Sequence, residues 1–251
     1  MEMNQLLVFT IFLPLIGAII CGLVPGSRLS IVRGIALVVT LVTLVSASVL
    51  IVQFPIPVAS EDEFAGTVME WFGGNASLNI QFRVALDGLS IWLFGLSALL
   101  MVTAVLVSWE AISARANLFY AMLLLLECGC LGVFAARDII LFYVFFEFTL
   151  IPLFFLIGIW GSEQRRYAAI KFFIFTLAGS VLTFLGLLSI VWWASVRSGE
   201  LTFSIASLTE TLRPDPIDLG WQLTIFLALF AGFAIKVPLF PLHTWLPLAH
   251  V

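Results

Sequence analysis

The sequence predicts an all-α fold, a polytopic bundle of about seven transmembrane helices. Its 251 residues are 62% hydrophobic and only 10% charged. Soluble domains carry about 25% charged residues, so this composition indicates an integral membrane protein. The second observation is a series of apolar runs, each close to the roughly 20 residues that a helix needs to cross the hydrocarbon core. Together they predict a single transmembrane domain over residues 1–251.

The runs can be justified in order along the chain. The first has an acid and no base before it, so we interpret it as a retained helix rather than a cleaved signal peptide. The fourth and fifth are separated only by residues 136–138, which predicts a tight hairpin. The sixth is long enough to predict a tilted helix. The predicted spans are residues 6–24, 31–54, 89–109, 117–135, 139–160, 167–194 and 221–241.

The distribution of charge predicts the orientation. Two polar segments, 55–88 and 195–220, interrupt the apolar runs, and both fall on the side that receives most of the acids when connections alternate. Short cytoplasmic loops carry the excess of Lys and Arg. We therefore expect a multi-pass protein of the bacterial inner membrane, with its N-terminus and both polar segments outside. The side expected to be cytoplasmic receives Arg28, Arg33, Arg115, Arg165, Arg166 and Lys171.

Two charged residues lie deep in separate apolar runs. Glu147 belongs to the run 139–160 and Lys236 to the run 221–241. A charge at the centre of a membrane helix costs roughly 3 kcal/mol, so such residues usually face a bundle interior or a wet path and carry ions or protons. The structural alternatives are an acid retained for packing specificity and a lysine that extends to the interface. Translocation of protons or cations is the first functional hypothesis.

Prolines accompany both charges. Pro152 has no N–H to donate to the Phe148 carbonyl, so the fifth run contains an unsatisfied acceptor. A helix broken at membrane depth is tolerated only where protein or a water-filled cavity receives such groups. The seventh run is interrupted more strongly, by Pro238, Pro241 and Pro247, which are expected to free the carbonyls of Ala234, Val237 and His243.

Further titratable residues are candidates for the same path. Histidine is a common proton carrier in proteins, and His243 is either a proton relay or an interfacial anchor beside Trp245. Glu127 is a third intramembrane acid, expected either on the proton path or in a structural hydrogen bond to a neighbouring helix. A basic group at the start of the sixth run is interpreted as a solvated anchor or, alternatively, as a field that biases Glu147; it consists of Arg165, Arg166 and Lys171.

Cofactor motifs are missing from the sequence. It contains no nucleotide-binding glycine motif, and its three cysteines form no CxxC motif or Cys/His cluster that would predict zinc or an iron–sulfur centre. The net charge of −4 argues against a nucleic-acid partner. The chain itself is therefore expected to hold no cofactor or metal and to have the lipid bilayer as a partner.

Three stretches carry a resemblance to a known family. They are FYVFFEFTLIPLFFLIGIWG (142–161), AAIKFFIFTLAGS (168–180) and FAIKVPLFPLHTWLPLAH (233–250). They resemble the antiporter-like membrane subunits of proton-pumping NADH–quinone oxidoreductase, respiratory complex I, of the subunit M (chain 4) type. The resemblance covers most of the chain from about Arg83 onward. It implies the first half of an inverted-repeat fold with a broken seventh helix, and proton translocation coupled to electron transfer.

The resemblance also implies roles for residues and partners. Glu147 would be the family's fifth-helix glutamate and Lys236 the lysine of its broken seventh helix, an ion pair that opens and closes as protons move. His243 matches the histidine that follows this lysine, whereas position 248 is Leu where the family has Asp. The partners would be other membrane subunits of complex I. Partner subunits would also hold NADH, FMN, iron–sulfur clusters and quinone.

Two other functions stay open at the level of the sequence. The first is a subunit of a multisubunit Na⁺/H⁺ antiporter, which shares the arrangement of glutamate and lysine. The second is a truncated, non-transporting scaffold subunit. The chain stops soon after Lys236 without a polar tail, and we interpret this as a C-terminal truncation.

Overall fold

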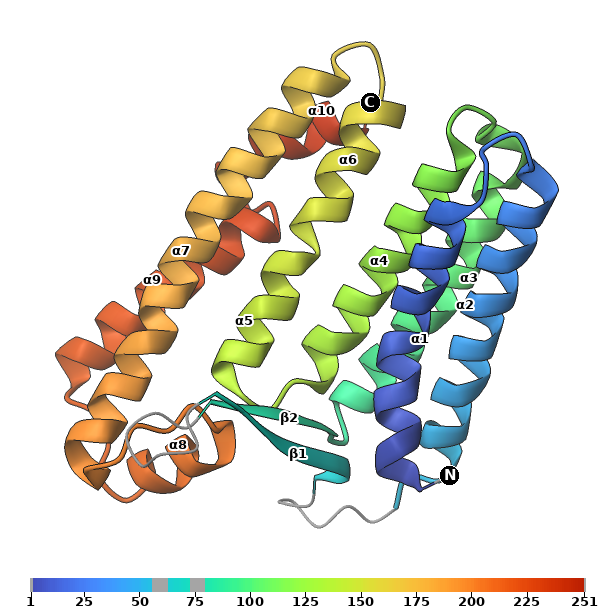
Figure 1. The fold of residues 1–251 in the computed structure, drawn as a ribbon. Coiled ribbons are helices and arrows are strands. Elements are labelled where there is room, and N and C mark those ends of the chain that lie inside the picture. Colours follow the sequence, from blue (N-terminus) through green and yellow to red (C-terminus); the bar gives the residue numbers. More distant parts are fainter. Residues whose placement is uncertain (1, 56–62, 73–79, 251) are drawn as a thin grey trace. The chain divides into compact units, whose positions relative to one another are not determined.

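The structure is a computed structural model that describes residues 2–55, 63–72 and 80–250. Seven helical spans in these ranges are long and apolar enough to cross a membrane (Figure 1). The predicted all-α, polytopic fold class is confirmed. The spans are α1 (Met3–Leu23), α2 (Leu29–Val52), α3 (Ser90–Ala111), α4 (Ala116–Ala135), α5 (Ile139–Phe148) continued by α6 (Leu150–Trp160), α7 (Arg165–Ser198) and α9 (Leu219–Lys236).

The polar segments contain short elements that the sequence analysis did not predict. Strands β1 (Phe64–Phe72) and β2 (Ile80–Leu86) form a two-stranded sheet. They occupy part of the expected loop 55–88, of which residues 56–62 and 73–79 lie outside the described residues. The segment 195–220 contains α8 (Ile205–Leu212). After α9 come a 3-10 turn, η1 (Leu242–Trp245), and the short helix α10 (Leu246–His250).

The described chain forms two compact units. The first comprises Met1–Val68 with Arg83–Ala136, and the second comprises Met69–Phe82 with Arg137–Val251. In the first unit, α1 packs on α4 and α2 packs on α3. Gly17 lets α1 approach α2 closely, because a side chain at this position would collide with Val39 of α2.

Two polar contacts connect elements inside the first unit. The guanidinium of Arg33 donates to the Ile112 carbonyl at 2.9 Å. This carbonyl is at the C-terminal end of α3, where helical acceptors lack intrahelical donors. The Ser108 hydroxyl lies 3.3 Å from the Tyr120 hydroxyl, which ties α3 to α4. The outer faces stay apolar, as in Val38 and Val45, which are exposed in α2.

The second unit is organised by α7, which packs along α9 and against α6. Glycines set the approach of α7 to α9. A Cβ at Gly232 of α9 would collide with the Thr183 hydroxyl and the Gly179 carbonyl of α7. At Gly186, it would press on the Leu229 side chain. This small-residue contact fixes the register of the helix that carries Lys236.

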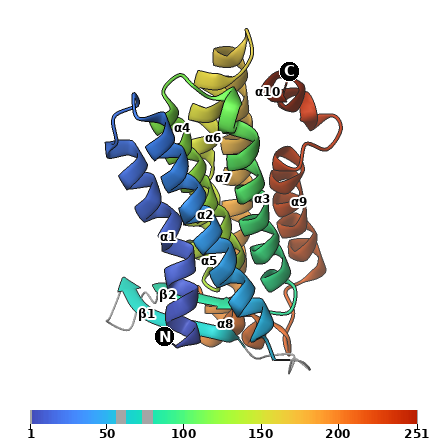
Figure 2. The same ribbon diagram turned by 90° about the vertical axis from the view of Figure 1, so that its right-hand side faces the viewer.

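The seventh span differs from its expected limits. It was predicted to reach Pro241, but α9 ends at Lys236 and residues 237–241 are not helical. Figure 2 shows this interruption between α9 and α10. The physical reason is Pro238, which has no N–H for the helical bond. The fifth span is also divided, at Thr149, into α5 and α6. The expectation of a single transmembrane domain stays a prediction.

Candidate functional site

Both ends of α5, the helix that carries Glu147, are fixed by side-chain hydrogen bonds. Asp138 is fully buried before α5 and accepts from the N–H groups of Ile140 and Leu141 at 2.9 and 3.2 Å, an N-cap that fixes where the helix starts. At the other end, the Thr149 hydroxyl donates to the Phe146 carbonyl at 2.8 Å. Glu147 lies in this last turn of α5, directly before the break.

Glu147 is half-buried, and one of its carboxyl oxygens has no partner. Oε1 is shielded from solvent and accepts no hydrogen bond from the residues that the structure describes. Tyr143, one turn earlier, interacts with Glu147 and with Ser180 of α7. The Tyr143 ring stacks on Phe184 with centroids 4.4 Å apart, which holds the phenol against α7. An acid with a shielded, unpartnered oxygen can accept a proton or a moving cation.

Lys236, the last residue of α9, reaches the residue next to Glu147. Its ammonium donates to the Phe146 carbonyl at 3.0 Å and lies over the Phe146 ring. That ring contacts the rings of Phe142 and Phe233, with centroids 5.5 and 6.1 Å away. Aromatic faces attract cations, so the Phe146 ring contributes to binding of the ammonium. The Lys236 side chain therefore reaches the backbone of the residue that precedes Glu147, from a helix far away in sequence.

Two carbonyls in the last turn of α9 accept backbone hydrogen bonds. The Val237 N–H donates to the Phe233 carbonyl at 2.7 Å, and the Leu239 N–H donates to the Ala234 carbonyl at 2.9 Å. The expectation that Ala234 has a free carbonyl is therefore wrong, because Leu239 donates to it where Pro238 cannot. The expectation is also wrong for His243, whose carbonyl accepts from the Leu246 N–H.

His243 lies in η1, beyond the break. Its Nδ1 is buried and has no hydrogen-bond partner among the described residues. The imidazole lies 5.5 Å from the Phe240 ring, centroid to centroid. A ring nitrogen shielded from solvent and without a protein partner is available to a water molecule or a proton donor. Its place in a relay stays a prediction.

Glu127 belongs to the other unit, on α4. Its side chain is completely buried, and neither carboxyl oxygen has a hydrogen-bond partner among the described residues. The alternative of a structural hydrogen bond to a neighbouring helix is therefore not what the structure shows. Its role in proton movement stays a prediction.

The predicted basic group lies at the start of α7. Arg165 and Arg166 are exposed. Lys171 is half-buried, with its ammonium 5.8 Å from the centroid of the Phe175 ring. Whether these residues anchor the helix or influence Glu147 stays a prediction. Among the described residues, no cluster of His, Cys, Asp and Glu could hold a metal ion.

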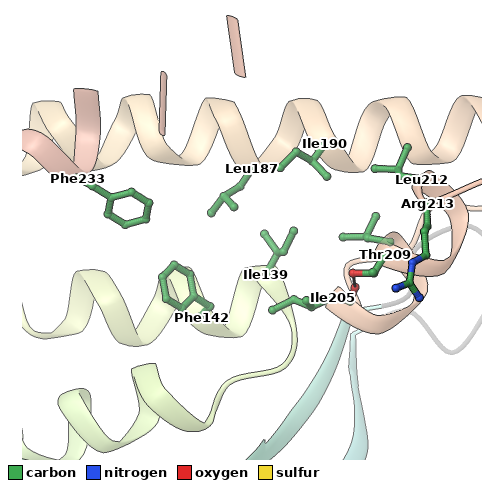
Figure 3. Close-up of a pocket in the computed structure, with 10 residues that line it drawn as sticks. Ile139, Phe142, Leu187, Ile190, Ile205, Thr209, Leu212, Arg213 and Phe233 are labelled. Atoms are coloured by element: carbon green, nitrogen blue, oxygen red, sulfur yellow. Dashed lines mark hydrogen bonds between the residues drawn. The ribbon is translucent and has the colours of Figure 1, made fainter. Parts of the chain in front are cut away.

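An apolar pocket adjoins the aromatic cluster. It has a volume of about 640 Å³ and lies among α5, α7, α8 and α9 (Figure 3). One end is formed by Phe142 and Phe233, the two rings that contact Phe146, and the other by Thr209 and Arg213. Its lining is otherwise aliphatic, so it offers few groups to conduct a proton.

Sequence reasoning missed two residues of the site. Phe146 was not singled out, although its carbonyl and ring both receive Lys236. Trp245 was considered only as a neighbour of His243, yet its indole N–H donates to the Ile235 carbonyl at 2.9 Å. A phenylalanine among many, and a tryptophan near a membrane surface, carry no signal that would distinguish these contacts.

Comparisons with known proteins give one consistent family. A family model described as NADH:quinone oxidoreductase/Mrp antiporter, TM, matches residues 136–251. NADH-quinone oxidoreductase subunit M of Pseudomonas aeruginosa is 36% identical over 98% of this chain and 49% of its own length. NADH-ubiquinone oxidoreductase chain 4 of Arabidopsis thaliana is 36% identical over 96% of this chain and 46% of its own length. The chain thus spans about half the length of these curated relatives.

Two solved structures contain chains with a similar fold. A chain of respiratory complex I from Thermus thermophilus with bound NADH aligns with a TM-score of 0.76 and 31% identity, covering 97% of this chain and 46% of that chain. A chain of the Mrp complex from Dietzia sp. aligns with a TM-score of 0.77 at 20% identity, covering 97% of this chain and 25% of that chain. At that identity the second match concerns the fold alone.

Proposed function

We propose that this chain is a member of the NADH:quinone oxidoreductase/Mrp antiporter family and contributes a proton-translocating half-channel to an NADH:quinone oxidoreductase of the complex I type. The names of its relatives of the subunit M and chain 4 type support this choice. In this proposal the chain is a component of the enzyme and carries no redox chemistry itself. NADH, FMN, iron–sulfur clusters and quinone are held by partner subunits.

The observation that carries the proposal is the contact of Lys236 with Phe146. The ammonium rests on the carbonyl and ring of the residue that precedes Glu147, whose Oε1 is shielded and unpartnered. Charges interact strongly where water is scarce. A displacement of the ammonium by a few ångströms therefore changes its interaction with the Glu147 carboxyl group. In this proposal, the Lys236 ammonium moves between two positions, and this movement loads a proton onto Glu147 and releases it.

The remaining residues have supporting roles in this proposal. His243 and Glu127 extend the proton path, since each presents a buried polar atom without a protein partner among the described residues. Arg165, Arg166 and Lys171 anchor α7 at the cytoplasmic face or, as the alternative, modulate the field at Glu147. The chain lies in the bacterial inner membrane with its N-terminus outside, next to other membrane subunits of complex I.

Replacement of Lys236 tests the proposal in the assembled membrane complex. Lys236→Ala should reduce NADH-driven proton uptake by inverted vesicles at least about tenfold, since a tenfold change corresponds to only about 1.4 kcal/mol. NADH oxidation by an artificial acceptor, which bypasses quinone, should stay normal and report intact assembly. Arg28→Ala changes an exposed cation at the start of α2 and is the matched control. Full proton uptake with Lys236→Ala would refute the proposal.

The same vesicles distinguish the antiporter alternative. The antiporter alternative is retained because the fold is similar to that of a chain of the Mrp complex. A proton-translocating subunit should give the same proton uptake in sodium and potassium media. Uptake that requires sodium and disappears with Lys236→Ala would favour a Na⁺/H⁺ antiporter subunit instead.

A further inference from the structure

Trp245 joins the two helix breaks of the second unit. It lies in η1, after the interruption that follows Lys236, and only 7% of its surface is exposed. Its indole N–H reaches back over the interruption to the Ile235 carbonyl, at 2.9 Å. Ile235 is the residue directly before Lys236, so this bond acts on the last turn of α9.

The bond replaces one that the proline break removes. In an uninterrupted helix, Leu239 would donate to Ile235, and residue 238 would donate to Ala234. Pro238 has no N–H, so Leu239 donates to Ala234 instead, at 2.9 Å. The Ile235 carbonyl would then have lost its helical donor in a region without bulk water, where an unsatisfied acceptor is costly. The Trp245 indole supplies that missing donor.

The Trp245 ring packs beside the other helix break, the one between α5 and α6. Its centroid lies 5.1 Å from that of Phe172 on α7, and it packs in one buried cluster with Phe172 and Leu150. Leu150 is the first residue of α6 and follows Thr149, whose hydroxyl shares the Phe146 carbonyl with Lys236. The indole is thus fixed to the start of α6 on one side and to the end of α9 on the other.

We propose that Trp245 is a positioning residue that holds the Lys236 ammonium at the Phe146 carbonyl, acting through the hydrogen bond from its indole to Ile235. The inference rests on the proposed function, because it assigns Trp245 to the placement of the lysine that moves protons. The relevant group is the N–H and not the ring as such. Loss of the N–H leaves Ile235 without a donor, so the last turn of α9 holds Lys236 less firmly.

Two replacements isolate the N–H. Trp245→Phe keeps a ring for the contact with Phe172 and removes the donor. Site-specific incorporation of benzothienylalanine, in which sulfur replaces the N–H, keeps the bicyclic shape and protects the fold if phenylalanine is not tolerated. The matched control applies the same two replacements to Trp221, a half-exposed tryptophan at the start of the same helix.

The readout is the number of protons translocated per NADH oxidised by the assembled complex, with artificial-acceptor activity as the measure of assembly. Both Trp245 replacements should lower this ratio roughly three- to tenfold, as expected for one hydrogen bond, with assembly unchanged. The Trp221 replacements should leave it unchanged. A merely structural role would lower assembly but not the ratio in assembled complexes, so a wild-type ratio with benzothienylalanine at position 245 would overturn the inference. If Lys236→Ala also pumped normally, the proposed function itself would fail.

Discussion

The Phe146 carbonyl is the point where the two helix breaks meet. It accepts the Thr149 hydroxyl at 2.8 Å and the Lys236 ammonium at 3.0 Å. A carbonyl oxygen has two lone pairs, so it can accept both donors at once. The ammonium is therefore bound by a backbone group that carries no net charge. Oε1 of the neighbouring Glu147 is shielded and accepts no hydrogen bond from the described residues.

A residue-scale prediction concerns Glu127, whose carboxyl oxygens are both buried and unpartnered. In Glu127→Gln, the new side chain has nearly the same volume as a protonated glutamate but cannot exchange a proton. We expect the assembled complex to keep its artificial-acceptor activity while its proton uptake falls several-fold. Glu127→Asp, which retains the carboxyl group, should be less affected. Wild-type proton uptake with Glu127→Gln would show that the acid is structural only.

The candidate site could be predicted in part from single residues. Glu147 and Lys236 stood out because a charge in a long apolar run is costly, whatever its neighbours are. Which atoms Lys236 contacts could not be predicted, because that depends on the register between α5 and α9. The donor role of Trp245 was hidden for the same reason, since it depends on the shift of the Leu239 hydrogen bond to Ala234.

At the scale of elements, the approach of α7 to α9 decides where Lys236 lies. Small residues hold the two backbones close together, most tightly where Gly232 faces Thr183 and Gly179. Without a hydrophobic driving force between helices in lipid, such van der Waals packing provides much of the association energy.

Gly232→Leu tests this packing. The added side chain collides with the α7 backbone, which cannot move aside cheaply, so we expect a destabilisation of about 3 kcal/mol or more. It should appear as a lower midpoint of thermal unfolding in detergent and as reduced assembly of the complex. Gly220→Leu is the matched control, because open space surrounds Gly220 in the first turn of the same helix. Equal melting temperatures of the two variants would contradict this account of the interface.

The seven-span fold class could be predicted because composition and length alone identify a membrane helix. The helix α4 begins at Ala116 and ends at Ala135, close to the predicted residues 117–135. The end of α9 was predicted less well because hydropathy continues through residues 237–241 although helical hydrogen bonding does not. Strands β1 and β2 were missed, since two short strands produce no signal comparable with a run of apolar residues.

For the molecule as a whole, the resemblance stated from the sequence is confirmed by relatives over nearly the entire chain. The motifs that carried it, around Glu147 and Lys236, are the segments that the structure brings together at Phe146. What the whole chain does in its membrane depends on orientation, which is a prediction from charge.

The orientation can be tested with two cysteines at opposite ends of α7. A cysteine at Glu200 should react with an impermeant thiol reagent from outside intact cells, and one at Ser162 should not. Both positions are exposed in the structure, and α7, which separates them, is 34 residues long. The native cysteines should be replaced first. The opposite labelling pattern would reverse the orientation.

The central claim is that Glu147 and Lys236 act as one proton-transferring unit. The most direct test measures NADH-driven proton translocation by assembled complexes that carry Glu147→Gln, Lys236→Ala, or both. Members of one unit are not additive. We therefore predict a large loss in each single variant and a loss in the double variant that is smaller than the two combined. Full translocation in either single variant, or losses that multiply in the double variant, would contradict the account.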